Sequence, residues 1–295
     1  MKLSDLAELL LLAALWGGSF LFMRIAAPVL GPIWLIELRV LLAGLVLLPV
    51  LAKLKLLGEF HRNFWTLLIV GCINSALPFS LLAFASVSLP AGFTSILNGT
   101  APLFGTIIAS VWLKEKLTPT RIVGFMLGFA GVIVLVGWQN VAATPEFLMA
   151  VLAGLSGALM YAIAAPYIKH TMKDLPSLVV TTGSQLGAAL VLMPVLPFTV
   201  PRQTPSLGVV ISVLTLAVAS TAFAYILYFR LIRNIGSTKA LTVTYLVPLF
   251  AMVWGALILK ETVTISMMFG CGLVLLGTAI ANDLFKQFSR QSLKS

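Results

Sequence analysis

The sequence predicts an all-α integral membrane protein with ten transmembrane helices, arranged as two inverted five-helix repeats around a central cavity. Three observations predict this fold class: the composition, the spacing of the apolar stretches and an internal repeat. Of the 295 residues, 60% are hydrophobic and only 9% are charged. A soluble domain carries about 25% charged residues because its surface faces water. Most of this surface is therefore expected to face lipid.

The net charge does not indicate a nucleic-acid partner, although it is strongly positive. The formal charge is +10, and a basic soluble domain would raise the possibility of nucleic-acid binding. Here the basic residues are scattered in short segments between apolar stretches, a pattern that sets the orientation of membrane proteins. We therefore expect the lipid bilayer as a partner, and no nucleic acid.

The apolar stretches are long and numerous enough for ten spans. A helix needs about 20 mostly apolar residues to cross about 30 Å of hydrocarbon. The sequence meets this condition at residues 6–28, 33–52, 64–85, 91–113, 119–138, 147–168, 177–197, 207–229, 238–259 and 265–284. Proline is tolerated in the first turn of a helix but not in its interior. Breaks are therefore expected at Gly31-Pro32, Thr118-Pro119, Thr144-Pro145, Leu175-Pro176 and Thr204-Pro205.

The distribution of Lys and Arg predicts the orientation of these spans. An even number of spans puts both termini on one side, and the segments on that side carry Lys2, Lys53, Lys55, Arg62, Lys114, Lys116, Arg121, Lys169, Lys173, Arg230, Arg233, Lys239, Lys286, Arg290 and Lys294. The opposite loops carry only Arg24, Arg202 and Lys260, and Arg39 lies inside a span. Because basic residues accumulate in cytoplasmic loops, both termini are expected in the cytoplasm.

An internal repeat divides the chain into residues 1–143 and 144–295. A shift of 146 residues aligns Pro102-Leu103-Phe104 with Pro248-Leu249-Phe250, and Leu113-Lys114-Glu115 with Leu259-Lys260-Glu261. The same shift pairs Thr118 with Thr264, Gly124 with Gly270, Leu127 with Leu273, and Gly131 with Gly277. Each unit holds five spans, and five is odd, so the second unit is expected to be inverted relative to the first.

Inverted repeats favour a transport function. Secondary transporters use them to build a substrate site near the bilayer midplane, between the two halves. The sequence has no HExxH, no GxSxG and no phosphate-binding glycine loop followed by Lys-Ser or Lys-Thr, so neither hydrolysis nor ATP-driven pumping is expected. Its two cysteines, Cys72 and Cys271, show no metal-ligand spacing. We expect no enzyme activity, no cofactor and no bound metal.

Arg39 is the leading candidate for substrate binding, because ionisable residues deep in a membrane span are usually functional. It could hold an anionic group of a substrate, or it could snorkel outward or bond the backbone of another helix. The 146-residue shift places it over Gln185, so one half offers a cation where the other offers a neutral amide. Glu37 lies nearer the end of the same span, where snorkelling is at least as good an explanation.

Neutral polar residues and aromatic residues complete the candidate site. The repeat aligns Asn74 and Ser75 with Ser220 and Thr221, and Asn98 with Thr244. Any one of them could simply make an interhelical hydrogen bond, but as a symmetric set they are expected to line a common cavity. The aromatic candidates lie away from helix ends, where interfacial aromatic residues gather, and could either stack on a substrate or fill the core. The candidate substrate-binding set is Arg39, Asn74, Asn98, Gln185, Trp16, Tyr161, Tyr225, Tyr245, Thr221 and Thr244.

Glu115 and Glu261 are repeat-related and stand at the ends of two spans, just ahead of threonines that begin the next helices. This position indicates a role in helix-end electrostatics rather than in chemistry.

Several of these segments resemble the EamA-type transporters of the drug/metabolite transporter superfamily. The similar segments are Tyr228 to Ile232, Ile235 to Ala240, Tyr245 to Pro248, Gly255, Lys260-Glu261, Pro102 to Glu115, and Leu15-Trp16-Gly17-Gly18-Ser19. The resemblance implies a ten-helix carrier of the bacterial inner membrane with a central cavity, which commonly exports amino acids or related metabolites. A helix-two arginine, here Arg39, fits the same pattern. Since Arg39 is alone inside the membrane, phosphorylated substrates are disfavoured.

The sequence therefore predicts alternating-access export of a small polar metabolite, with amino acids as the leading candidates, by a chain expected to act as a monomer. Two alternatives stay open. One is a multidrug exporter of apolar cations, which would be indifferent to Arg39. The other is a membrane sensor or assembly factor that binds a ligand without transporting it.

Overall fold

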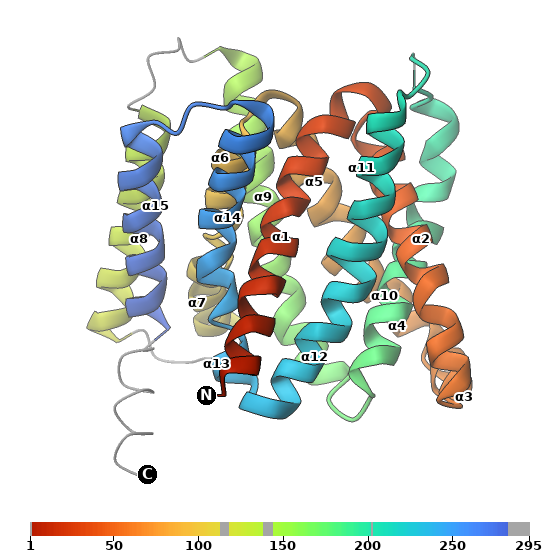
Figure 1. Ribbon diagram of the computed structural model, residues 1–295. Coiled ribbons are helices and arrows are strands. Elements are labelled where there is room, and N and C mark those ends of the chain that lie inside the picture. Colours follow the sequence, from red (N-terminus) through yellow and green to blue (C-terminus); the bar gives the residue numbers. More distant parts are fainter. Residues whose placement is uncertain (1, 113–117, 138–143, 202, 283–295) are drawn as a thin grey trace.

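A computed structural model describes residues 2–112, 118–137, 144–201 and 203–282. Within these ranges the chain forms helices and no strands. The long helices stand side by side in one bundle, and the N-terminus lies at the same end as α12 and α13 (Figure 1). We call this end the terminal end and the opposite end, where α14 is joined to α15, the far end.

The first half of the chain supplies five helical stretches and a short surface helix. Its elements are α1 (Leu3–Leu30), α2 (Pro32–Lys53), α3 (Leu57–Arg62), α4 (Phe64–Gly71), η1 (Cys72–Ala76), α5 (Leu77–Ser88), α6 (Ala91–Asn98), α7 (Ala101–Trp112) and α8 (Pro119–Gly137). The elements α4, η1 and α5 form one continuous stretch, and α6 with α7 forms the next.

The second half supplies five more stretches. Its elements are α9 (Pro145–Thr171), α10 (Ser177–Leu192), η2 (Met193–Phe198), α11 (Leu207–Ala217), η3 (Val218–Phe223), α12 (Ala224–Ile235), α13 (Ser237–Ala240), α14 (Val243–Leu259) and α15 (Ile265–Ala281). Here α10 ends in the 3₁₀ segment η2, and α11, η3 and α12 are continuous.

These helices confirm the prediction of an integral membrane protein. Within the described ranges, eight stretches are long and apolar enough to cross a bilayer, and α14 and α15 are shorter apolar helices. All ten predicted spans coincide with one of these stretches. Two boundaries were wrong: α12 continues to Ile235 instead of ending at residue 229, and α14 begins at Val243 because the separate short helix α13 precedes it. Lys114, Glu115, Lys116, Arg202, Lys286, Arg290 and Lys294, on which the predicted repeat and orientation partly rest, lie outside the described residues.

Large apolar side chains point outward from the bundle. Ile133, Phe269 and Val111 are 69%, 61% and 75% exposed. A soluble monomer rarely exposes so many large apolar groups together. A lipid environment removes the cost of this exposure, so the surface agrees with the composition.

The helices begin where local chemistry satisfies their first N–H groups. Gly31 separates α1 from α2 with φ +76°, a conformation that costs glycine nothing. The Thr144 hydroxyl accepts a hydrogen bond from the Phe147 amide at 3.2 Å, as an N-cap does. At the predicted Thr204-Pro205 break, the N-cap is Ser206, whose hydroxyl accepts from the Val209 amide at 3.5 Å.

Two of the long stretches contain a wide π-helical turn near their middle. These turns are η1 and η3. Pro78 follows η1 and has no N–H to donate to the Asn74 carbonyl, and its ring would crowd that carbonyl in a regular helix. The wider turn relieves this conflict. Single π-helical turns of this kind often mark functional sites.

Glycine allows α8 and α15 to approach each other through their backbones. A Cβ added at Gly277 would lie 2.4 Å from the Gly128 nitrogen, and one added at Gly131 would lie 2.8 Å from the Gly270 carbonyl oxygen. Small residues permit such close packing between membrane helices. The two helices stand together at one side of the bundle (Figure 1).

Candidate functional site

A large cavity of about 1030 Å³ lies between the helices. Its walls come from α1, α2, η1, α5, α6, α7, α9, α10, η3, α12, α13, α14 and α15. The lining extends to the exposed residues Lys169, Lys173 and Ser177, where α9 is joined to α10, and to Ser237 at the start of α13. These residues lie at the terminal end, so the cavity opens at that end.

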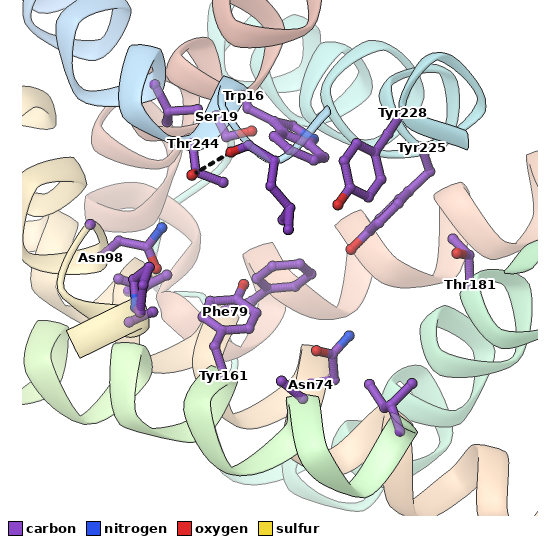
Figure 2. A pocket seen from close by; sticks show the side chains of 18 of the residues that line it. Trp16, Ser19, Asn74, Phe79, Asn98, Tyr161, Thr181, Tyr225, Tyr228 and Thr244 are labelled. Carbon is purple, nitrogen blue, oxygen red and sulfur yellow. Dashed lines mark hydrogen bonds between the residues drawn. The ribbon is translucent and has the colours of Figure 1, made fainter. Parts of the chain in front are cut away.

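The cavity brings together eight of the ten residues proposed from the sequence: Trp16, Arg39, Asn74, Asn98, Tyr161, Tyr225, Thr244 and Tyr245. They come from seven different elements, and several face a common space (Figure 2). Gln185 and Thr221 do not line the cavity. Both are fully buried behind its wall, at 0% exposure, where each bonds one neighbouring side chain.

Arg39 is buried and is held from three directions. Its side chain is 5% exposed, and its Nε donates to Thr221 Oγ1 at 3.0 Å. The Arg39 Cζ lies 3.8 Å from the centre of the Phe79 ring, a cation–π arrangement, and Nη1 lies 3.9 Å from the Met23 sulfur. Snorkelling to the surface, one of the three explanations considered for Arg39, is therefore wrong for this structure.

The Arg39 charge has no carboxylate partner among the described residues, since no ion pair within 4.0 Å includes it. Nor does any described residue of the cavity lining carry a carboxylate, whereas Arg39, Lys169 and Lys173 are basic. Glu37 is buried at 3% exposure and does not line the cavity, so it does not snorkel either. The cavity is therefore electropositive.

Gln185 makes a hydrogen bond that corresponds to the Arg39 bond. Its Nε2 donates to Ser75 Oγ at 3.2 Å. The shift of 146 residues converts Arg39 to Gln185 and Ser75 to Thr221, so each bond joins a helix of one half to a π-helical turn of the other half. The two contacts have the same form, but only one carries a charge.

Aromatic rings form the walls on both sides of the cavity. Trp16 lies 5.2 Å from Tyr228 and 6.3 Å from Tyr225 between ring centres, and Phe79 lies 6.2 Å from Tyr161. These rings surround the open space in Figure 2. Aromatic faces of this kind can pack on an apolar group or attract a cation.

Four buried polar atoms of the lining have no hydrogen-bond partner among the described residues: Ser19 Oγ, Ser95 Oγ, Asn98 Oδ1 and Ser220 Oγ. Leaving such groups unpaired is costly. They are therefore free to bind water or a polar ligand inside the cavity.

Ser19, Ser95, Phe79 and Tyr228 also line the cavity but were not predicted from the sequence. Three of them lie one helical turn from a residue that was proposed, since Ser19 follows Trp16, Ser95 precedes Asn98 and Tyr228 follows Tyr225 by three positions. Residues three apart share a helix face, so this spacing could have identified them. Phe79 lies five positions after Asn74, a spacing that only the wide π-helical turn brings to one face.

A comparison with protein families decides the class of this architecture. The sequence profile of the EamA-like transporter family matches residues 6–137 and matches again at residues 148–282. The chain belongs to the EamA-like transporter family. It is therefore a membrane transporter and not an enzyme.

Relatives in the EamA-like family share about a quarter of their residues with this chain. An uncharacterized transporter of Archaeoglobus fulgidus is 23% identical, covering 92% of this chain and 96% of the relative. Protein PecM of Dickeya dadantii is 25% identical, over 99% and 95%. The inner membrane transporter YedA of Escherichia coli is 26% identical, over 85% and 81%.

A solved structure described as "Crystal structure of protein" has a similar fold. It superposes with a TM-score of 0.67 at 18% identity, covering 98% of this chain and 99% of the solved chain. At this identity the likeness concerns the fold alone.

Proposed function

We propose that this EamA-like transporter exports small polar metabolites, with amino acids or related compounds as the leading candidates, by alternating access. One observation carries the proposal: Arg39 lies buried in the cavity wall with no carboxylate partner among the described residues. A buried cation is costly unless a counter-charge joins it. The carboxylate of a substrate would supply that charge.

An amino acid fits the rest of the lining. Its carboxylate would meet the Arg39 guanidinium, which can hold it with two parallel hydrogen bonds. Its ammonium would meet the faces of Trp16 and Tyr225, which lie 6.3 Å apart between ring centres. Neutral hydroxyls such as those of Ser19 and Ser220 would complete the polar contacts.

Two inverted five-helix repeats, residues 1–143 and 144–295, would supply the alternating movement. The 146-residue shift that relates the sequences of the halves also relates η1 to η3. It converts the Arg39–Thr221 bond into the Gln185–Ser75 bond, as an exchange of the two halves requires. The family profile matching twice, once in each unit, gives independent support.

The proposed orientation would let the cavity take up cargo from the cytoplasm. Basic residues accumulate in cytoplasmic segments, and by this rule the terminal end, where the cavity opens, faces the cytoplasm. An exporter collects its cargo from that side. We propose the bacterial inner membrane as the location, with both termini cytoplasmic, and a monomer as the working unit.

The test is efflux from proteoliposomes loaded with a mixture of amino acids and common metabolites. We expect the release of one chemical group of carboxylates, and its loss in the Arg39→Ala and Arg39→Lys variants, which should still insert and fold. Unchanged flux in Arg39→Ala would rule out the proposed role of Arg39. No release under any ion gradient, from protein shown to be folded, would favour a sensor or assembly factor.

The aromatic walls alone would also suit the second candidate, an exporter of apolar cations. However, a cation in this cavity would meet Arg39 and no carboxylate of the described lining. Efflux of cationic dyes that is indifferent to Arg39 would support this alternative over the metabolite exporter.

A further inference from the structure

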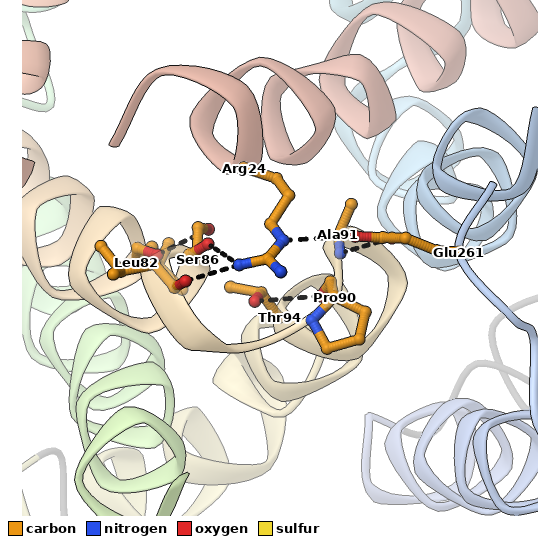
Figure 3. Close-up of polar contacts among 8 residues, drawn as sticks. Arg24, Leu82, Ser86, Pro90, Ala91, Thr94 and Glu261 are labelled. Atoms are coloured by element: carbon orange, nitrogen blue, oxygen red, sulfur yellow. Dashed lines mark hydrogen bonds and ion pairs between the residues drawn. The ribbon is translucent and has the colours of Figure 1, made fainter. Parts of the chain in front are cut away.

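The far end of the bundle is closed by a cluster that joins three separate segments (Figure 3). Arg24 of α1 donates from Nη1 to the carbonyl oxygens of Ser86 at 3.1 Å and Val87 at 2.5 Å. Its Nε lies 3.4 Å from Glu261 Oε1. The Glu261 Oε2 accepts from the Ala91 amide at 3.0 Å. We call these five residues the far-end cluster.

Each charge of the far-end cluster also satisfies the end of a helix. Ser86 and Val87 lie in the last turn of α5, whose final carbonyls have no partner within the helix. Ala91 is the first residue of α6, whose first N–H groups are likewise free. Cations are favoured at helix C-termini and anions at N-termini. Arg24 and Glu261 therefore stabilise the turn between α5 and α6 from both sides.

Gly255 makes room for this arrangement. A Cβ added there would lie 2.5 Å from Glu261 Oε2, so any larger residue would displace the carboxylate from the Ala91 amide. The backbone supports the same geometry, because the Glu261 amide donates to the Gly255 carbonyl at 3.1 Å. The position of the Glu261 carboxylate is thus set by Ala91 of α6 and by Gly255 of α14.

The helices joined by the far-end cluster are the ones that line the cavity below it. α1 contributes Trp16 and Ser19 to the lining, α6 contributes Ser95 and Asn98, and α14 contributes Thr244 and Tyr245. While the cluster is intact, these helices are held together at the far end, and none of its five residues belongs to the cavity lining. Alternating access also requires a state in which the cavity is open at the far end, and in that state α1, α6 and α14 must separate there.

We propose that Arg24 and Glu261 form the far-side gate of the transport cycle, an inference that rests on the proposed alternating access. Their ion pair must break for the cavity to open at the far end. The pair is suited to this because its side chains are 30% and 16% exposed. Partly exposed ion pairs contribute little to stability, so this one can break and form again in each cycle.

The gate can be tested without a substrate, by labelling a cysteine inside the cavity. Asn98 lines the cavity and is partly exposed, so Asn98→Cys is a suitable reporter after both native cysteines, Cys72 and Cys271, are replaced by Ala. A membrane-impermeant maleimide is added to intact cells, where it reaches only the outer face, or to inside-out vesicles. The parent should react slowly in cells and rapidly in inside-out vesicles.

In the reporter background, Glu261→Gln removes the ion pair while keeping the size of the side chain. We expect it to raise the labelling rate in intact cells about tenfold, because the ion pair with Arg24 is lost and the hydrogen bond from the Ala91 amide loses its charged acceptor. Gly255→Ala should act in the same direction, since it displaces the same carboxylate. The matched control is Glu59→Gln, which breaks the Glu59–Arg62 pair at 2.7 Å near the terminal end and should leave the rate in intact cells unchanged.

Equal labelling of parent, Glu261→Gln and Gly255→Ala in intact cells would overturn the gate, provided that all three label normally in inside-out vesicles. An increase in the Glu59→Gln control would overturn it too, since the effect would not be specific to the far end. If labelling changes as expected but no flux is found with any metabolite, the gate stands and the proposed export function fails. The two inferences are therefore tested separately.

Discussion

Arg39 and Gln185 occupy corresponding positions in the two halves, but only Arg39 lines the cavity. Each donates a hydrogen bond to a hydroxyl in a π-helical turn of the other half, Arg39 to Thr221 and Gln185 to Ser75. Arg39 also lines the cavity and stacks on Phe79, whereas Gln185 is sealed behind the wall at 0% exposure.

This difference distinguishes the hydrogen bond that the fold requires from the charge that only the cavity carries. A neutral amide is sufficient to join a helix to a π-helical turn, as Gln185 does. The guanidinium at position 39 makes the same join but adds a charge whose burial is costly. Among the described residues that charge meets the Phe79 ring and no carboxylate, which is why the proposed function assigns it a ligand.

Arg39→Gln gives the first half the chemistry of the second and should have the largest effect. The bond to Thr221 can be kept by the amide, so folding is expected to be preserved. The charge that would bind a carboxylate is lost, and hydrogen bonds to charged groups contribute about 1.5–3 kcal/mol. We expect transport of the cargo identified in proteoliposomes to fall about 100-fold, the upper part of that range.

Thermal unfolding in detergent provides the control for Arg39→Gln. A midpoint close to that of the parent, together with lost transport, would support a role in ligand binding. Retained transport with a lowered midpoint would show that Arg39 serves the fold.

A second repeat-related pair, Asn98 and Thr244, extends the comparison inside the cavity. Asn98 Oδ1 has no partner among the described residues, whereas the Thr244 hydroxyl already donates to the Leu241 carbonyl at 2.8 Å. Asn98→Ala should therefore raise the KM for export about tenfold, as one unmade polar contact of about 1.4 kcal/mol implies. Thr244→Val should change it less than about twofold; the opposite order would contradict this assignment.

Thr221→Val and Ser75→Ala remove the acceptors of the two corresponding bonds and should have the smallest effects. Interhelical hydrogen bonds in membranes average about 0.6 kcal/mol. Thr221→Val frees the Arg39 guanidinium to turn, so we expect the KM of this variant for the exported cargo to rise about threefold. Thr221→Ser, which keeps the hydroxyl, should restore the parental KM. Ser75→Ala should leave KM at the parental value, and an equal rise in both variants would mean that the bonds act only on packing.

Much of this architecture is predictable because the relevant signals are local. Hydropathy finds each span within its own sequence, and the breaks at Gly31 and Thr144 follow from local backbone chemistry. Arg39 is distinctive because charge is rare within the spans. The repeat then drew attention to Asn98 and Thr244, which do line the cavity.

The facing of individual side chains was harder to predict. Helices that are apolar on every side give little indication of which face turns inward, so nothing in the sequence placed Gln185 and Thr221 behind the wall instead of in the cavity. The pairing of Arg24 with Glu261 depends on how the halves are assembled. The sequence indicated helix-end electrostatics for Glu261, and its carboxylate does lie at a helix end, but that of α6 rather than of its own helix.

The contact between α8 and α15 has a mechanical consequence. Because Gly124, Gly131, Gly270 and Gly277 bring the two backbones together, this contact contains few side chains whose rotamers could change. α15 contributes Leu275 and Thr278 to the cavity lining, whereas no residue of α8 lines the cavity, and the two helices stand at one side of the bundle (Figure 1). α8 belongs to the first half of the chain and α15 to the second. In the proposed transport cycle a rigid contact between them would act as a pivot, because the halves could tilt about it while the distance between these two helices stays constant.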